Sequence, residues 1–371
     1  MVSWHNRFKM MKDKIQIFTI LWLTIFTFIS CGEDKSGAKK VEVVASESDA
    51  EEKNAEITTD ELDSTSNSSL NNSLASIKVL DLYCLRSGIG GFISLSDVYP
   101  LSDHPDSLAI PKFELENKDS LSYIKLKSKY RKRFLSKTNI LETDSVFIYD
   151  YSTDVLLSFS VKKLNVLAYI NDYMQIKSGN QSDYMIGFEV NKHYLVGLGE
   201  HYDKALVFIG KENPFTQGQM KPIVWQKIQI EKFPFEKSNL TEIQKQFKNK
   251  KAVNAQAYSY ETDSYQVFIK DYTAPNRSFV LDRHLIVIDK QNGNVVNEAM
   301  FNNTEGTSVA TLNFGVNNDN FPDLKEQWTG KLFKDKPEVI FGFEWTSFGC
   351  PSINFINSQR KYVQINCDNR H

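Results

Sequence analysis

The sequence predicts a mainly β protein, built from antiparallel strands and hairpins with one or two peripheral helices. Phe and Tyr are abundant, at 25 and 16 residues, whereas the chain has only 10 Pro. Aromatic side chains pack well on half-buried strand faces, and short apolar runs recur between polar turns. Asn292 and Gly293 separate two such runs, which is the strongest short-range hairpin signal because a type I′ turn needs positive φ at both central residues.

The strands of the first half follow from the apolar runs in chain order. Strands are expected at residues 77–85, 146–149, 155–159, 164–170, 184–190 and 205–210. The turn-like residues 150–154 join the second and third of these into a hairpin. The glycine-rich residues 86–91 lead into another apolar run rather than a helix, so they predict a hairpin turn and not a phosphate-binding loop.

The second half has the same character, with one helix. Strands are expected at residues 284–290, 295–301, 339–343, 353–356 and 362–365. Asn239 and Glu242 resemble a capping box, and Leu240, Ile243 and Phe247 follow on one face, which predicts a helix over residues 240–248.

Domain organisation rests on a change in composition near residues 214–222, where Gly, Gln and Pro cluster. This predicts two β-rich domains, at residues 76–215 and 216–371, the second with the short helix and a C-terminal disulfide hairpin. No repeat of fixed period is present, which disfavours solenoids and propellers.

The N-terminal residues predict an export signal. Four basic residues between positions 7 and 14 precede an apolar stretch of about 15 residues, whereas a membrane-spanning helix needs roughly 20. The stretch ends in Phe28-Ile29-Ser30-Cys31, which resembles the lipobox of bacterial lipoproteins, and the acidic residues after it resemble the surface-export signals of Bacteroidota lipoproteins. The resemblance covers residues 1–35. It implies a signal peptide over residues 1–30, lipidation of Cys31, and anchoring to the outer membrane on its periplasmic or cell-surface side. An ordinary secretory peptide or an uncleaved anchor is the alternative.

Residues 31–75 predict a disordered acidic tether. Between residues 32 and 75, eleven acidic residues face four Lys, and aromatic residues are absent. Such a composition buries too little apolar surface to offset chain entropy. About 44 flexible residues span roughly 35–40 Å root-mean-square, so the tether is expected to hold a folded part away from the membrane.

The charge of the expected folded part excludes one class of partner. Residues 76–371 carry about +2, because the signal region contributes about +3 and the tether about −7 to the total of −2. General nucleic-acid binding needs a strongly basic field and is not expected. The expected partners are the membrane, through the lipid anchor, and an envelope glycan or protein.

The cysteines predict one disulfide. Thiols tend to pair outside the cytoplasm, and Cys350 and Cys367 flank two strands expected to be adjacent. A loop of this length contributes about 3 kcal/mol to stability. Cys84 is then expected as a buried free thiol in the first strand. The alternatives are a bond between Cys84 and either partner, or a metal site of Cys350, Cys367 and His371, a spacing atypical of zinc.

One segment clusters oxygen ligands. Residues 315–324 resemble a single copy of the calcium loop of FG-GAP proteins, with Gly315 and Asn320 where that family has an acid and a glycine. The resemblance implies calcium ligands at Asn317, Asp319 and Asp323, because hard cations prefer oxygen. An Asn- and Asp-rich turn that bonds its own backbone is the alternative. No other cofactor is expected.

Two further segments are candidate binding surfaces. In residues 123–133 basic and apolar side chains alternate, so that a strand there has one basic face, formed by Lys125, Lys127, Lys129 and Arg131. This face suits an anionic glycan, lipopolysaccharide or an acidic protein, or it is simply a charged edge strand. Trp345 belongs to an aromatic cluster at residues 341–348, a candidate for stacking on a sugar or for core packing.

Catalytic motifs are sparse. The spacings H-E-x-x-H and G-x-S-x-G are absent, and His284 is a candidate base or a structural histidine. The sequence therefore favours a lipid-anchored envelope protein that binds a glycan or a protein and is not an enzyme. Alternatives are a hydrolase of envelope or extracellular polymers, whose carboxylates come from distant strands and leave no spacing signal, and an immunity-type lipoprotein.

Overall fold

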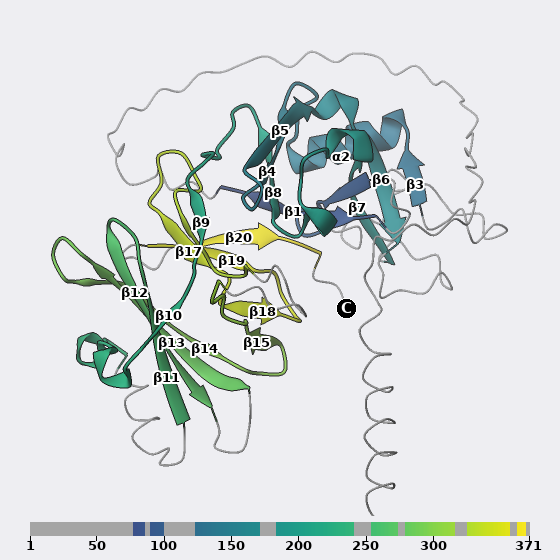
Figure 1. The fold of residues 1–371 in the computed structure, drawn as a ribbon. Coiled ribbons are helices and arrows are strands. Elements are labelled where there is room, and N and C mark those ends of the chain that lie inside the picture. Colours follow the sequence, from purple (N-terminus) through teal and green to yellow (C-terminus); the bar gives the residue numbers. More distant parts are fainter. Residues whose placement is uncertain are drawn as a thin grey trace, which may run out of the picture.

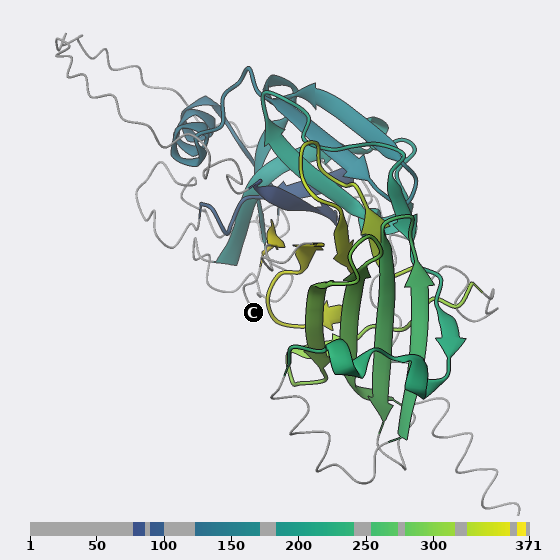
Figure 2. The ribbon, with the colours of Figure 1, turned by 90° about the vertical axis from the view of Figure 1, so that its left-hand side faces the viewer.

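The computed structural model confirms a mainly β architecture (Figure 1). It describes residues 77–85, 90–99, 123–170, 183–240, 254–273, 279–315, 325–356 and 362–368. The N-terminal strands, in blue and teal, and a sheet of long strands, in green, lie at opposite ends of the described structure, with the C-terminal strands in yellow between them (Figures 1 and 2).

Two antiparallel sheets that share β1 enclose the first core. The strands are β1 (Val79–Cys84), β2 (Gly90–Ser94), β3 (Tyr123–Leu126), β4 (Ser145–Asp150), β5 (Val155–Ser160), β6 (Asn165–Ile170), β7 (Tyr184–Asn191) and β8 (Ala205–Gly210). The end of β1 pairs with β2 in the order β3-β6-β7-β2-β1, and its beginning pairs with β8, beside β4 and β5. Side chains of both sheets, including Ile93, Phe188 and Val207, form one core.

Helix α2 (Ser128–Thr138) corrects the strand expected over residues 123–133, which ends at Leu126. Phe134 and Leu135 are buried in the first core, and the ring of Phe134 packs edge-on against Phe188. Tyr130 and Phe134 lie four residues apart and therefore share a helix face. The helix ends at Asn139, whose left-handed backbone (φ 56°) lets its N–H donate to the carbonyl of Leu135.

The C-terminal strands extend the sheet beyond β1. They are β20 (Tyr362–Asn366), β19 (Ser352–Phe355), β17 (Val339–Phe341), β16 (Trp328–Gly330) and β9 (Met220–Pro222). Among the pairings of the described strands, β1–β20 is the only parallel one, with Val79 opposite Ile365. The expected domain boundary near residue 215 falls between β8 and β9, and the β1–β20 pairing makes the sheet continuous across it.

A separate five-stranded sheet holds the longest strands, which run side by side in Figure 2. It comprises β10 (Gln226–Ile228), β11 (Asn254–Glu261), β12 (Tyr265–Thr273), β13 (Val280–Asp289) and β14 (Val295–Asn302), in that order. Both faces of β13 are buried: Leu285 and Val287 join one apolar cluster, whereas Ile286 and Ile288 join another that includes Phe233. Burial on both faces explains why this strand is a continuous apolar run.

Short elements complete the described structure. They are the ribbon of β15 (Thr307–Val309) with β18 (Glu344–Thr346) and the 3₁₀ turns η3 (Val161–Lys163), η5 (Lys192–Tyr194), η6 (Glu200–Tyr202), η7 (Ile230–Lys232) and η8 (Phe235–Lys237).

The expected hairpins β4–β5, β13–β14 and β19–β20 are confirmed. The type I′ turn expected at Asn292 and Gly293 is wrong. Of these two residues only Gly293 has positive φ (74°), and the two strands are joined by a longer loop. In that loop Asp289 accepts hydrogen bonds from the N–H of Gln291 and the side chain of Asn292. Strands β11 and β12 were not expected. The helix expected over residues 240–248 lies outside the described residues except for Leu240.

Candidate functional site

Carboxylates from both halves of the chain converge on Tyr151, which follows β4. Its ring packs edge-on against the rings of Trp328 and Phe341, at 5.1 and 5.3 Å between centroids. Burial raises the pKa of Tyr151 well above its usual value, and four nearby carboxylates raise it further. The four acids are Asp203, Glu326, Asp150 and Asp81.

One lysine and one tryptophan complete this acidic junction. Lys204 Nζ lies 3.3 Å from both Asp203 Oδ2 and Glu326 Oε2. The indole Nε1 of Trp345 donates to Glu326 Oε2 at 3.4 Å. Trp345 is 43% exposed, whereas Trp328 is 3% exposed. We call Trp345, Glu326, Lys204 and Asp203 the Trp345 site: an exposed indole beside a fixed donor and two acceptors.

The aromatic cluster expected at residues 341–348 divides in two. Phe341 and Phe343 are buried, and the Phe343 ring stacks on Phe301. Trp345 and Phe348 are exposed at 43% and 53%. Core packing accounts for the first pair, and only the second pair lies at the surface.

Asp81 has an unusual environment for a carboxylate. Burial raises its pKa to about 6; the N–H of Leu82, at 2.9 Å, opposes this, and the charge of Asp203 adds to it. A carboxyl group whose charged form is disfavoured by burial costs stability when it ionises, and groups with shifted pKa values are frequent at functional sites.

Replacing Asp81 by Asn is expected to raise the free energy of unfolding by about 2 to 3 kcal/mol at pH 7. The folded pKa lies above the unfolded value, so the folded state holds the proton more tightly and stability falls as the pH rises from about 4 to about 6. The gain from the substitution therefore disappears below about pH 4. Urea unfolding of both proteins across this range measures it.

Asp150→Asn is the matched control. Asp150 Oδ1 accepts from the N–H groups of Ser152 and Thr153 and from the Ser152 hydroxyl, and Oδ2 accepts from the N–H of Gly199. An Asn side chain has one acceptor oxygen, so a buried N–H loses its partner and stability falls. Equal effects of the two substitutions at pH 7 would refute the account of Asp81.

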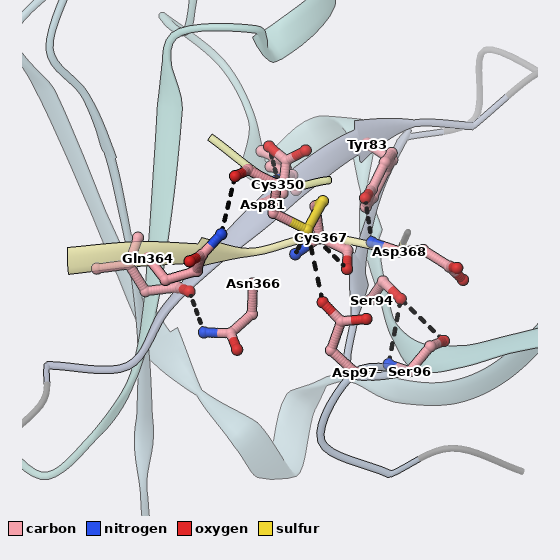
Figure 3. Close-up of a disulfide and its surroundings, with 12 residues drawn as sticks. Asp81, Tyr83, Ser94, Ser96, Asp97, Cys350, Gln364, Asn366, Cys367 and Asp368 are labelled. Carbon is pink, nitrogen blue, oxygen red and sulfur yellow. Dashed lines mark hydrogen bonds between the residues drawn. A yellow bond between two sulfur atoms is a disulfide. The ribbon is translucent and has the colours of Figure 1, made fainter. Parts of the chain in front are cut away.

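The predicted disulfide between Cys350 and Cys367 is present, with 5.5 Å between Cα atoms (Figure 3). It closes the open end of the β19–β20 hairpin, where Gln364 Nε2 also donates to the carbonyl of Cys350 at 2.8 Å. The Tyr83 hydroxyl accepts from the N–H of Asp368 at 2.6 Å, which ties the end of β20 to β1.

Cys84 corrects a second expectation: it is disulfide-bonded and half-buried, not a buried free thiol. The carboxylate of Asp97 lies 3.6 Å from Cys350 Sγ, and with Cys367 these atoms lie within 4.8 Å of one another. Because the two sulfurs are bonded to each other, they are not thiolate ligands, and the group does not form a metal site. His371 lies outside the described residues.

The expected basic face of residues 123–133 is divided by the change from strand to helix. Lys125 Nζ pairs with Glu189 at 2.9 Å. Arg131 is half-buried and holds Glu142 with two hydrogen bonds. Lys127 and Lys129 are exposed. Only these last two remain available to a partner.

His284 is fully buried, which excludes it as a base that a substrate reaches. Its Nε2 pairs with Glu298 Oε1 at 2.8 Å, and its ring lies 5.1 Å from that of Phe233. Sequence reasoning missed its neighbour Arg283, which is 1% exposed and pairs with Asp271. The available signal was the position of Arg283 directly before the apolar run expected at residues 284–290, since buried charges are paired.

The remaining predicted sites are not described. Cys31 and the calcium ligands expected at Asn317, Asp319 and Asp323 lie outside the described residues. None of the described helices is both long and apolar enough to cross a bilayer. Comparisons with protein-family models, curated proteins and solved structures gave no match to this chain.

Proposed function

We propose that this chain is a lipid-anchored protein of the cell envelope that binds a glycan, without catalysis, at the Trp345 site. The exposed indole of Trp345, fixed by its bond to Glu326, is the observation that carries the proposal. An indole face stacks on the apolar face of a sugar ring, and the Glu326–Lys204 pair offers an acceptor and a donor to ring hydroxyls.

The charge of the site supports a neutral or cationic glycan. Four carboxylates near Tyr151 outnumber the one lysine, Lys204. A polyanionic ligand is repelled by this excess. The proposal therefore separates the Trp345 site from the basic residues of α2, which suit anions.

Trp345→Ala is expected to weaken glycan binding at least about tenfold, because large aromatic side chains dominate binding energy. After cleavage before Cys31 the chain retains three Trp, at 225, 328 and 345. The first two are 3% exposed, so iodide quenching of the emission reports mainly on Trp345. Oligosaccharides released from the envelope of the source cells should protect this emission from iodide.

Phe348→Ala is the matched control, since it removes a second exposed aromatic residue without touching the Glu326 bond. Binding that survives Trp345→Ala unchanged would remove the site from consideration. Unchanged urea midpoints for both variants exclude a folding defect as the cause.

The envelope location is supported by the lipoprotein-like signal sequence ending at Cys31. Two acyl chains anchor a protein stably, whereas one does not. We expect unreduced peptide mass spectrometry of the mature protein to find a diacylglyceryl thioether on Cys31 and no residue before it. An unmodified Cys31, or any residue still attached before it, contradicts the anchor.

A polymer hydrolase is the second candidate, favoured by Asp81. A carboxyl group with a pKa near 6 beside the carboxylate of Asp203 has the properties of a general acid with an ionised partner. If the chain is a hydrolase, Asp81→Asn abolishes turnover of the bound glycan while protection of Trp345 persists. If it only binds, no reducing ends are released by either protein.

A further inference from the structure

Exposed lysines without an ion pair to any described residue lie on α2 and on the turn η3, which Arg131 joins to it. There are six of them, and none forms an ion pair with any residue that the structure describes. We call this set the α2–η3 basic surface: Lys127, Lys129, Lys132, Lys137, Lys162 and Lys163.

The two parts of this surface are held together by Arg131. Besides its two bonds to Glu142, its guanidinium donates to the carbonyls of Leu164 and Val161, at 2.5 and 3.0 Å. These contacts fix η3 against α2. The two segments that carry the lysines are therefore held side by side.

The neighbouring acids are already engaged. Glu142 is held by Arg131, and the pKa of Glu142 lies below its usual value chiefly because of that bond. Glu189 accepts from the Tyr123 hydroxyl and from Asn165, and it pairs with Lys125. Of these two described acids, Glu142 also attracts Lys162, whereas neither forms an ion pair with the lysines of α2, so the described part of this surface keeps a net positive charge.

The same chain contains a segment of opposite charge. Residues 42–63 hold nine acidic residues and one lysine. The 35 residues from 42 to 76 span up to about 115 Å when extended. A compact domain of this size is about 50 Å across. The segment is therefore long enough to reach α2 and η3 from the start of β1.

We propose that residues 42–63 dock on the α2–η3 basic surface. The contact is electrostatic and needs no fixed backbone conformation. The contact draws the folded part toward its own N-terminal segment, and salt or another polyanion competes with it. This inference goes beyond glycan binding, since the Trp345 site carries the opposite charge and shares no residue with this surface.

Carbodiimide cross-linking of the full mature chain tests the contact, because this reagent joins only carboxylates and amines that touch. At 20 mM salt we expect the cross-links from residues 42–63 to concentrate on the six lysines. At 0.5 M NaCl, where screening acts over a few ångströms, their yield should fall about tenfold. Cross-links spread evenly over the exposed lysines, or insensitive to salt, would overturn the proposal.

A charge variant distinguishes docking from simple loss of a reactive amine. In Lys129→Gln/Lys132→Gln/Lys163→Gln, cross-linking to the three unchanged lysines, at 127, 137 and 162, should also fall several-fold. The matched control replaces three exposed lysines elsewhere, Lys227, Lys232 and Lys334, by Gln and should leave that yield unchanged. Equal yields in the two variants would contradict docking.

A competitor gives a readout independent of cross-linking. Fluorescent polyphosphate should bind at least tenfold more tightly when the nine acids of residues 42–63 are replaced by their amides. Equal affinity of the native and neutralised chains would show that the segment does not cover the lysines. Binding to the Trp345 site is not altered in either protein, so failure here leaves the proposed function untouched.

Discussion

Asp271→Ala is expected to lower the free energy of unfolding by about 3 to 5 kcal/mol, the largest effect of any single substitution considered. Arg283 on β13 donates through Nε and Nη2 to the two carboxylate oxygens of Asp271, at 2.7 and 2.9 Å. The exposed fractions are 1% for Arg283 and 5% for Asp271. Removing the carboxylate leaves a buried guanidinium without its counter-charge. Urea unfolding followed by circular dichroism measures the loss.

Two comparisons isolate the buried charge as the cause. Replacing both partners, in Asp271→Leu/Arg283→Met, should cost much less than Asp271→Ala, because no unpaired charge remains. The carbonyl of Ala310, which accepts from Arg283 Nη1 at 2.7 Å, still loses its donor in that variant. Glu261→Gln breaks the exposed pair with Lys290 and should have no measurable effect. A double variant as unstable as the single one would refute this explanation.

Cys350→Ser/Cys367→Ser is expected to lower the free energy of unfolding by about 3 kcal/mol. The bond joins residues 17 apart, and a loop of this size loses that much entropy in the unfolded chain. The double variant is preferable to a reducing agent, because reduction would also break the bond of Cys84.

The location of this disulfide predicts which strands open first when the bond is removed. It closes the β19–β20 hairpin, and β20 forms the parallel pairing that joins the C-terminal strands to β1. Amide hydrogen exchange should therefore accelerate at Ile365 and Asn366 before it does in the β13 strand. Uniform acceleration of exchange across the sheet that contains β20 and the sheet that contains β13 would mean that the bond acts only through the unfolded state.

Local patterns were sufficient for the hairpins. In β13–β14 and β19–β20 a turn separates two apolar runs close in sequence, so the pairing partner is the next strand along the chain. The Cys350–Cys367 bond was predictable for the same reason, because the hairpin brings its ends together. Strands β11 and β12 were missed since both alternate polar and apolar residues weakly and acquire buried faces only within the sheet.

Helix α2 shows where a local pattern was ambiguous. Residues 123–133 alternate as a strand does, yet from Ser128 onward the chain is helical. The apolar residues that decide the outcome, Phe134 and Leu135, lie beyond that window and are buried in the first core. Packing against Phe188 rather than local propensity sets the element type.

The candidate site was largely out of reach of sequence reasoning. Trp345 was singled out as an aromatic residue, but its partners Glu326, Lys204 and Asp203 have no spacing relation to it. Asp81, with its raised pKa, lies in a strand that reads simply as apolar. Contacts between residues more than a hundred positions apart depend on the sheet order, which a single sequence does not encode in any local period.

The sequence by itself determined the β class, the hairpins and one disulfide, because each arises from residues a few positions apart whose side-chain period and turn chemistry act locally. The tertiary structure alone decided that β1 pairs with β20, that the indole of Trp345 donates to Glu326, and that Arg131 joins α2 to η3. These features follow from burying apolar faces against one another. Burial depends on the whole assembled chain. It therefore brings together charged residues that lie far apart in the sequence and that no local pattern predicts to be neighbours.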